Sequence, residues 1–125
     1  MVEEINQSGG KAVAIRADHG NYADGELAVE ETVKQLGRLD IVVNNEGVSV
    51  FSPVDESERT IDELHKLHAV NTTGVAAVVR AATKYLREGG RVINIGSSFA
   101  VRVPFSGFAD YSASKAALEA YARGW

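Results

Sequence analysis

The chain has 125 residues, a hydrophobic fraction of 45% and a charged fraction of 24%, which is an ordinary composition for one globular domain. Its formal net charge of -4 and its scattered basic residues argue against a nucleic-acid-binding face. No apolar stretch is long enough to span a bilayer, and the absence of cysteine excludes disulfides and thiolate metal sites. We therefore expect no membrane or nucleic-acid partner and a cytoplasmic location.

The first part of the chain alternates between helical and extended patterns. Residues 2–5 are compatible with the end of a helix, which the glycine pair at 9–10 terminates. Residues 11–17 (KAVAIRA) alternate around β-branched side chains and predict a strand. Apolar residues then recur near helical spacing over 24–36, so we expect a second helix that Gly37 closes.

The central part contains a buried strand and a long helix. Residues 39–43 (LDIVV) form a short apolar run, which is typical of a parallel strand covered on both faces. After a loop, Thr60 and Glu63 form a capping box that starts a helix. We expect this helix to continue to about Leu86, with Asn71 inside it.

The last part repeats the alternation. Residues 91–95 (RVINI) predict a strand, and the Ala-rich segment 111–123 predicts a helix. Regular alternation of helices and strands predicts an open parallel α/β sheet with right-handed crossovers. The expected fold is therefore α/β, with about three strands and flanking helices.

Small polar residues follow each predicted strand. Asp18 follows the first, residues 44–47 (NNEG) follow the second, and residues 96–98 (GSS) follow the third. Ligands of open α/β sheets bind beyond the carboxyl ends of the strands. The same residue types dominate ordinary turns, and each group taken singly is better explained as a turn.

Tyr111 and Lys115 suggest a catalytic pair. Four residues apart at the start of a helix, they lie on one face, one turn from each other. A free phenol has a pKa near 10, and a nearby ammonium group lowers it by stabilising the phenolate. A general acid or base acting on a carbonyl or an alcohol requires such a lowered pKa. The spacing alone is weak, because an isolated match is usually a surface pair.

Five segments together resemble the short-chain dehydrogenase/reductase family in the family's order. They are KAVAIRAD (Lys11–Asp18), GRLDIVVNNEG (Gly37–Gly47), VNTTG (Val70–Gly74), GGRVINIGS (Gly89–Ser97) and YSASKAAL (Tyr111–Leu118). The resemblance implies a partial Rossmann-type doubly wound parallel sheet, with residues 1–125 as the central part of one NAD(P)-binding domain. It also implies hydride transfer between NADP or NAD and a small carbonyl or alcohol, in a homo-oligomer. The likeness is strongest to 3-oxoacyl-reductase-like and polyhydroxynaphthalene-reductase-like members.

The resemblance also assigns roles to catalytic residues. Tyr111 would be the proton donor or acceptor, and Lys115 would lower its pKa and bind the nicotinamide ribose. Asn71 would hold a water that links Lys115 to solvent. Ser97 would hold the substrate oxygen, and we prefer it to Ser98 because it directly follows the phrase that ends the rigid strand.

Cofactor contacts are implied at the ends of the first two predicted strands. Asp18 would meet the adenine amino group. Asn45 and Gly47 would let the backbone approach the adenosine ribose, while Tyr111 and Lys115 would face the nicotinamide end.

Two positions depart from the family pattern beside these contacts. Glu46 stands where the family has a small alanine, and its carboxylate would either crowd and repel the pyrophosphate side or point to solvent. His19 replaces an aliphatic residue, and we expect it to be solvated. His65 and His68 lie three apart on the long helix, but without cysteine or a nearby carboxylate trio we expect no metal site.

The family's glycine-rich phosphate turn does not occur in these residues, and we expect the family's segment that closes over the substrate to be missing from them as well. We therefore expect an internal fragment of such an enzyme. The alternative is a catalytically inactive fragment whose helices serve association only.

Overall fold

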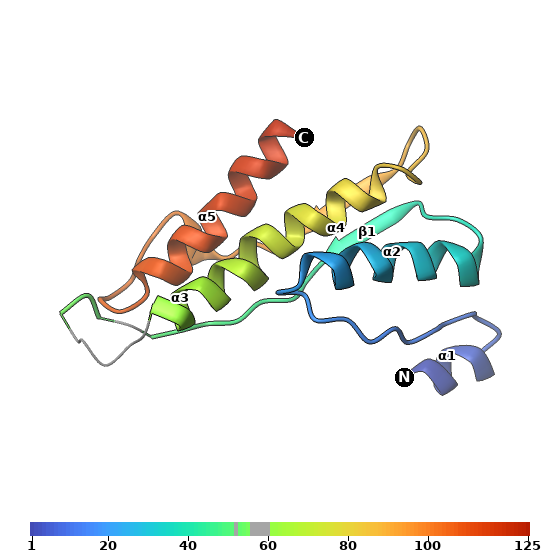
Figure 1. The fold of residues 1–125 in the computed structure, drawn as a ribbon, viewed down its shortest axis with the longest axis horizontal. Helices are drawn as coiled ribbons and strands as arrows, with labels where there is room; N and C mark the ends of the chain where they lie inside the picture. Colours follow the sequence, from blue (N-terminus) through green and yellow to red (C-terminus); the bar gives the residue numbers. More distant parts are fainter. Residues whose placement is uncertain (52, 56–60) are drawn as a thin grey trace.

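The computed structural model describes residues 1–51, 53–55 and 61–125, which form an α/β fold (Figure 1). The predicted residue Thr60 lies outside the described residues. The elements in chain order are α1 (Val2–Gln7), α2 (Tyr22–Leu36), β1 (Ile41–Asn44), α3 (Ile61–His68), the π-helical segment η1 (Ala69–Gly74), α4 (Val75–Ala82), β2 (Arg91–Asn94), the 3-10 turn η2 (Ser98–Ala100) and α5 (Ala109–Gly124).

The described sheet consists of β1 and β2, which pair in parallel with Ile41 opposite Arg91 and Asn44 opposite Asn94. Helices cover one face of this sheet. Val42 of β1 packs with residues of α2 and α4 in one apolar cluster, and Val92 of β2 packs against α4 and α5 in another. The core therefore lies between one face of the sheet and these three helices.

The opposite face of the sheet is open, contrary to the expectation that the strand would be covered on both faces. Ile41 and Val43 are 57% and 53% exposed, and Ile93 is 45% exposed. Side chains alternate between the two faces of a strand, and no element among the described residues packs on this second face. A continuous apolar run thus becomes half buried and half exposed.

Residues 11–17 are extended but form no strand, so the prediction of a strand there was wrong for this chain. The segment runs alongside α2 (Figure 1), and side chains tie down its first residues. Asn6 Oδ1 accepts a hydrogen bond from the Ala12 N–H at 2.8 Å, and Lys11 Nζ donates to the Gln35 carbonyl at 2.9 Å. Strand formation needs a neighbouring backbone to pair with, and none of the described strands lies beside this segment.

The helix boundaries follow local chemistry. Asn21 caps α2 by accepting a hydrogen bond from the Ala23 N–H at 3.0 Å, and Gly37 ends it in the left-handed conformation with φ 90°, as predicted. The predicted long helix is continuous from α3 through α4, but η1 interrupts its α-helical geometry around Asn71. Such π-helical turns occur often at functional sites.

Candidate active site

Asn71 is a fully buried polar residue near the ends of the strands. Its side chain has no exposed surface, and it bonds to both polar groups of the Val48 backbone. Its Oδ1 accepts from the Val48 N–H at 2.8 Å, while its Nδ2 donates to the Val48 carbonyl at 2.8 Å and to Ser114 Oγ at 3.0 Å. The amide therefore joins the segment after β1 to the interior of α5.

Lys115 is 4% exposed although it carries a charge, and it lies on the face of α5 that meets the end of β2. Its Nζ donates to the Ile95 carbonyl at 3.0 Å. An ammonium group has three donors, so this bond orients the group and leaves it able to donate further. A Cβ on Gly47 would lie 3.2 Å from this Nζ and 3.5 Å from Asn71 Oδ1, which means that the glycine permits this close approach.

Tyr111 lies one helical turn before Lys115, as the sequence predicted. Its backbone carbonyl accepts a hydrogen bond from Ser114 Oγ at 2.7 Å, so Ser114 links it to the amide of Asn71. Its ring makes edge-on contacts with Phe99 and Phe108, with centroid separations of 6.2 and 6.4 Å. The phenol thus stands beside an aromatic cluster formed by the loop that precedes α5.

The two candidate serines lie at the start of η2. Ser97 Oγ accepts a hydrogen bond from the Phe99 N–H at 3.2 Å, which caps this short turn. Ser98 is more exposed than Ser97. A hydroxyl that accepts one bond can still donate its own proton, so capping leaves Ser97 able to bind a substrate oxygen.

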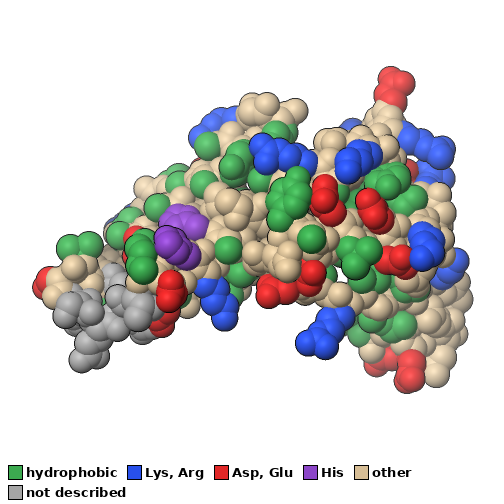
Figure 2. Space-filling view, viewed as in Figure 1, with side chains coloured by type: hydrophobic (Ala, Val, Ile, Leu, Met, Phe, Trp, Pro, Cys, Tyr) green, Lys and Arg blue, Asp and Glu red, His purple; other side chains and the backbone are tan. Residues whose placement is uncertain are grey.

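Asp18 lies apart from this cluster, in an open groove of about 610 Å³ that Arg16, Asp24 and Lys66 also line. Its Oδ1 accepts from the Gly20 N–H at 2.9 Å, and its own N–H donates to Asp24 Oδ2 at 2.9 Å. The groove contains both carboxylate and basic side chains. Basic and acidic residues are likewise interspersed over the face of the molecule in Figure 2.

Glu46 and His19 contact each other, which corrects the expectation that His19 is solvated. Glu46 Oε1 lies 2.5 Å from His19 Nε2, and the two side chains are 34% and 20% exposed. Burial raises the pKa of the Glu46 carboxyl, but the pairing with His19 and bonds from the backbone outweigh it, so the pKa lies below its ordinary value of 4.5. Glu46 therefore does not simply point to solvent, which was one of the two alternatives for this residue; its effect on the pyrophosphate side stays a prediction.

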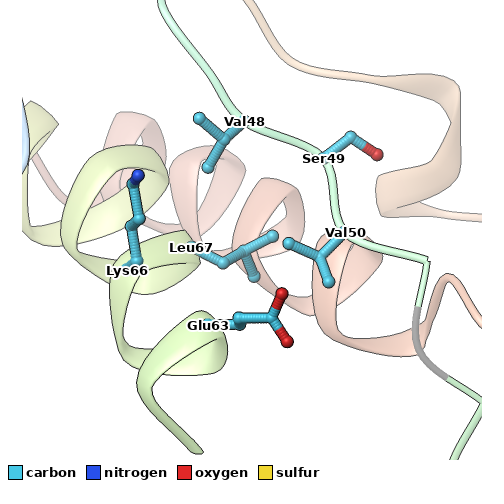
Figure 3. Close-up of a pocket in the computed structure, with 6 residues that line it drawn as sticks. All are labelled: Val48, Ser49, Val50, Glu63, Lys66 and Leu67. Carbon is cyan, nitrogen blue, oxygen red and sulfur yellow. The ribbon is translucent and has the colours of Figure 1, made fainter. Parts of the chain in front are cut away.

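A second hollow, of about 320 Å³, lies between α3 and the segment after β1 (Figure 3). The side chains of Val48, Val50 and Leu67 line it, with Lys66 and Glu63 from α3 and Ser49 at its edge. None of the predicted site residues lines it. The described residues also contain no group of three His, Asp or Glu side chains placed to hold a metal ion, and none of their helices has the length and hydropathy to span a membrane.

The arrangement suits proton transfer beside a bound polar molecule. Asn71, Lys115 and Gly47 converge, Tyr111 adjoins them, and Asp18 lies in a groove that Val48, the hydrogen-bond partner of Asn71, also lines. A buried ammonium group with donors to spare and a glycine that keeps backbone close to it fit a ligand rich in hydroxyl groups, such as the ribose of a dinucleotide. Sequence reasoning missed the bridging role of Ser114, although its place three residues after Tyr111 put it on the same helical face.

Known proteins resemble this chain over its whole length. Residues 1–125 match the family model described as short chain dehydrogenase. The chain is 42% identical over 121 residues to an uncharacterized oxidoreductase of Methylorubrum extorquens, a match that covers 96% of this chain and 47% of that protein. It is 39% identical over 123 residues to a hydroxynaphthalene reductase of Aspergillus fumigatus, covering 98% of this chain and 44% of that protein.

A solved structure shares the fold. The crystal structure of a short chain dehydrogenase from Burkholderia cenocepacia, in complex with NADP, superposes with a TM-score of 0.91 at 37% identity. This match covers 98% of the chain and 49% of the solved protein. The chain therefore spans about half the length of the proteins that it matches.

We expect Asn71→Ala to lower the free energy of unfolding of the whole protein by about 1–3 kcal/mol, because the Val48 N–H and carbonyl lose their partner. Asn45→Ala, the same substitution at an exposed position, should change it by less than about 0.5 kcal/mol. Denaturant unfolding of both variants measures the difference. Equal losses in the two variants would contradict the structural role of Asn71.

Proposed function

Because the chain belongs to the short chain dehydrogenase family, we propose that the whole protein is an NAD(P)-dependent oxidoreductase that interconverts a small carbonyl compound and its alcohol. The observation that carries this proposal is the buried Lys115 ammonium, held one helical turn from Tyr111 at the end of β2. When bound, the cofactor supplies or accepts the hydride. The residues of this chain position the reactants and move the proton.

In the direction of reduction, the Tyr111 hydroxyl donates its proton to the substrate oxygen as the carbonyl carbon gains a hydride. The adjacent ammonium of Lys115 stabilises the phenolate that remains, because an opposite charge favours the ionised form. In the direction of oxidation, the same phenolate removes the proton from the alcohol. One residue thus serves as general acid and as general base.

Asn71 supports this pair in two ways under the proposal. Its amide keeps α5 in register with the segment after β1, through Ser114 and Val48. The water assigned to Asn71 would donate a hydrogen bond to its Oδ1, because both protons of the amide nitrogen already have protein partners. Such a water would return a proton to the Lys115 end of the site.

NADP is the preferred cofactor under the proposal, and the complex of the Burkholderia cenocepacia dehydrogenase with NADP supports it. Asp18 would bind the adenine amino group in the groove that it lines. Asn45 and Gly47 would lie against the adenosine ribose, and Lys115 would bind the nicotinamide ribose. The leading substrate is a ketone, in line with the similarity to a hydroxynaphthalene reductase.

The alternative is association without catalysis. The exposed apolar side chains on one face of the described sheet, among them Ile41, Val43 and Ile93, favour contact with another protein surface. An intact enzyme of this family would also be a homo-oligomer under the proposal, so association and catalysis are compatible in the whole protein.

We expect Tyr111→Phe in the whole protein to remove most ketone reductase activity while NADPH binding survives, because the phenol proton is needed only at the reacting oxygen. Lys115→Ala should weaken both activity and binding. Turnover measured with NADPH and a ketone, beside cofactor fluorescence, separates the two effects. Near-normal turnover of the Tyr111→Phe variant would refute the mechanism.

The two serines give a separate test. Ser97→Ala should lower turnover by about a hundredfold, the loss typical when one donor to a developing oxyanion is removed. Ser98→Ala, the matched substitution at the next position, should have a mild effect. The opposite ranking would assign the substrate oxygen to Ser98.

A further expectation concerns the 125-residue polypeptide by itself. It should bind NADPH weakly or not at all, because its sequence contains no glycine-rich turn leading into a helix that could bind the pyrophosphate. Its open sheet face should make it associate. Fluorescence titration with NADPH and sedimentation measure both properties, and micromolar binding with turnover of a ketone would contradict this expectation.

A further inference from the structure

The ion pair between His19 and Glu46 joins two loops that are distant in sequence. His19 belongs to the loop that follows the extended segment 11–17, and Glu46 is the second residue after the end of β1. Their side chains meet at 2.5 Å, and both are partly buried. Both positions also depart from the family pattern, so the two departures lie in contact with each other.

Each partner of the pair is held by its own surroundings. Glu46 Oε2 accepts a hydrogen bond from the Asn45 N–H at 3.2 Å, so the carboxylate stays over the backbone that carries it. The His19 carbonyl packs against η1, where a Cβ on Gly74 would collide with its oxygen. The loop is thus seated on the same π-helical segment that carries Asn71.

The pair lies next to the residues assigned to the dinucleotide. Asn45 and Gly47 flank Glu46, while His19 follows Asp18 and lines the same open groove. The lowered pKa of the Glu46 carboxyl keeps it ionised at neutral pH. An unpaired carboxylate at this position, beside the groove that His19 lines, would repel a pyrophosphate more strongly than the same charge in water, because the side chain is partly buried.

We propose that His19 holds Glu46 beside the dinucleotide-binding groove that His19 lines, and that the two residues act as one unit that sets cofactor affinity. The inference rests on the proposed function, since it needs the groove to bind a dinucleotide. It assigns both residues to cofactor positioning and not to the chemical step. His19 holds the Glu46 carboxylate toward its own loop.

The test compares four versions of the whole protein: wild type, His19→Leu, Glu46→Ala, and the double variant that restores an aliphatic and a small residue together. Calorimetry with NADP⁺ at about pH 6, where an ordinary histidine is largely protonated, measures the dissociation constant at low and high salt. His19→Leu should raise it about tenfold at low salt and less at high salt, because salt screens the exposed repulsion. The double variant should return to within about twofold of wild type.

Kinetics add a readout that a purely structural role would not move. His19→Leu should raise the KM for NADPH while kcat stays nearly constant, which is the pattern of lost uniform binding. If His19→Leu does not fold, as judged by thermal unfolding, His19→Gln keeps a hydrogen-bond donor without the charge and should show the same dependence on salt.

Two results would overturn the inference: a double variant that binds as weakly as His19→Leu, or a loss of affinity that is equal at both salt concentrations. Failure of the proposed function looks different. In that case the wild type itself binds no NADP⁺ and reduces no ketone with NADPH, whatever the residues at positions 19 and 46. Tyr111→Phe is the matched control, since it should lose turnover and keep the wild-type dissociation constant.

Discussion

The buried amide of Asn71 joins three parts of the molecule that the chain keeps far apart. It satisfies both polar groups of the Val48 backbone after β1, and through Ser114 it reaches the carbonyl of Tyr111 in α5. Because the amide has no access to water, loss of any of these bonds leaves a buried group without a partner, which is costly. Together with the Lys115 bond to the Ile95 carbonyl and the packing of Leu118 near Val92, this side chain positions the Tyr111–Lys115 helix relative to the sheet.

The two strands of the described sheet carry apolar side chains on both of their faces, although helices cover only one face. Val42 and Val92 pack beneath the helices, while Ile41, Val43 and Ile93 face outward on the same two strands. The apolar run of β1 therefore contains more apolar side chains than the core of the described residues buries. The open apolar face is compatible with association with another protein surface. The proposed chemistry lies elsewhere, at the carboxyl ends of the strands, where open α/β sheets bind their ligands.

Charge compensation is a second constraint at the same edge. Glu46 introduces a carboxylate between Asn45 and Gly47, where a dinucleotide would pass close to the backbone under the proposal. The side chain of His19, from another loop, contacts this carboxylate. A single departure from the family pattern would leave a half-buried charge alone. Gly47, the next residue, has no side chain and lets the backbone stay close to Lys115.

The sequence by itself determined the α/β class, the end of α2 at Gly37, and the placement of Tyr111 and Lys115 on one helical face, because these features depend on local spacing. Only the tertiary structure decided which segments pair and which charges meet. Residues 11–17 have the pattern of a strand but no neighbouring strand among the described residues. His19 and Glu46 are 27 positions apart, so no local periodicity relates them. Strand pairing and ion pairs are contacts between distant segments, and packing creates them.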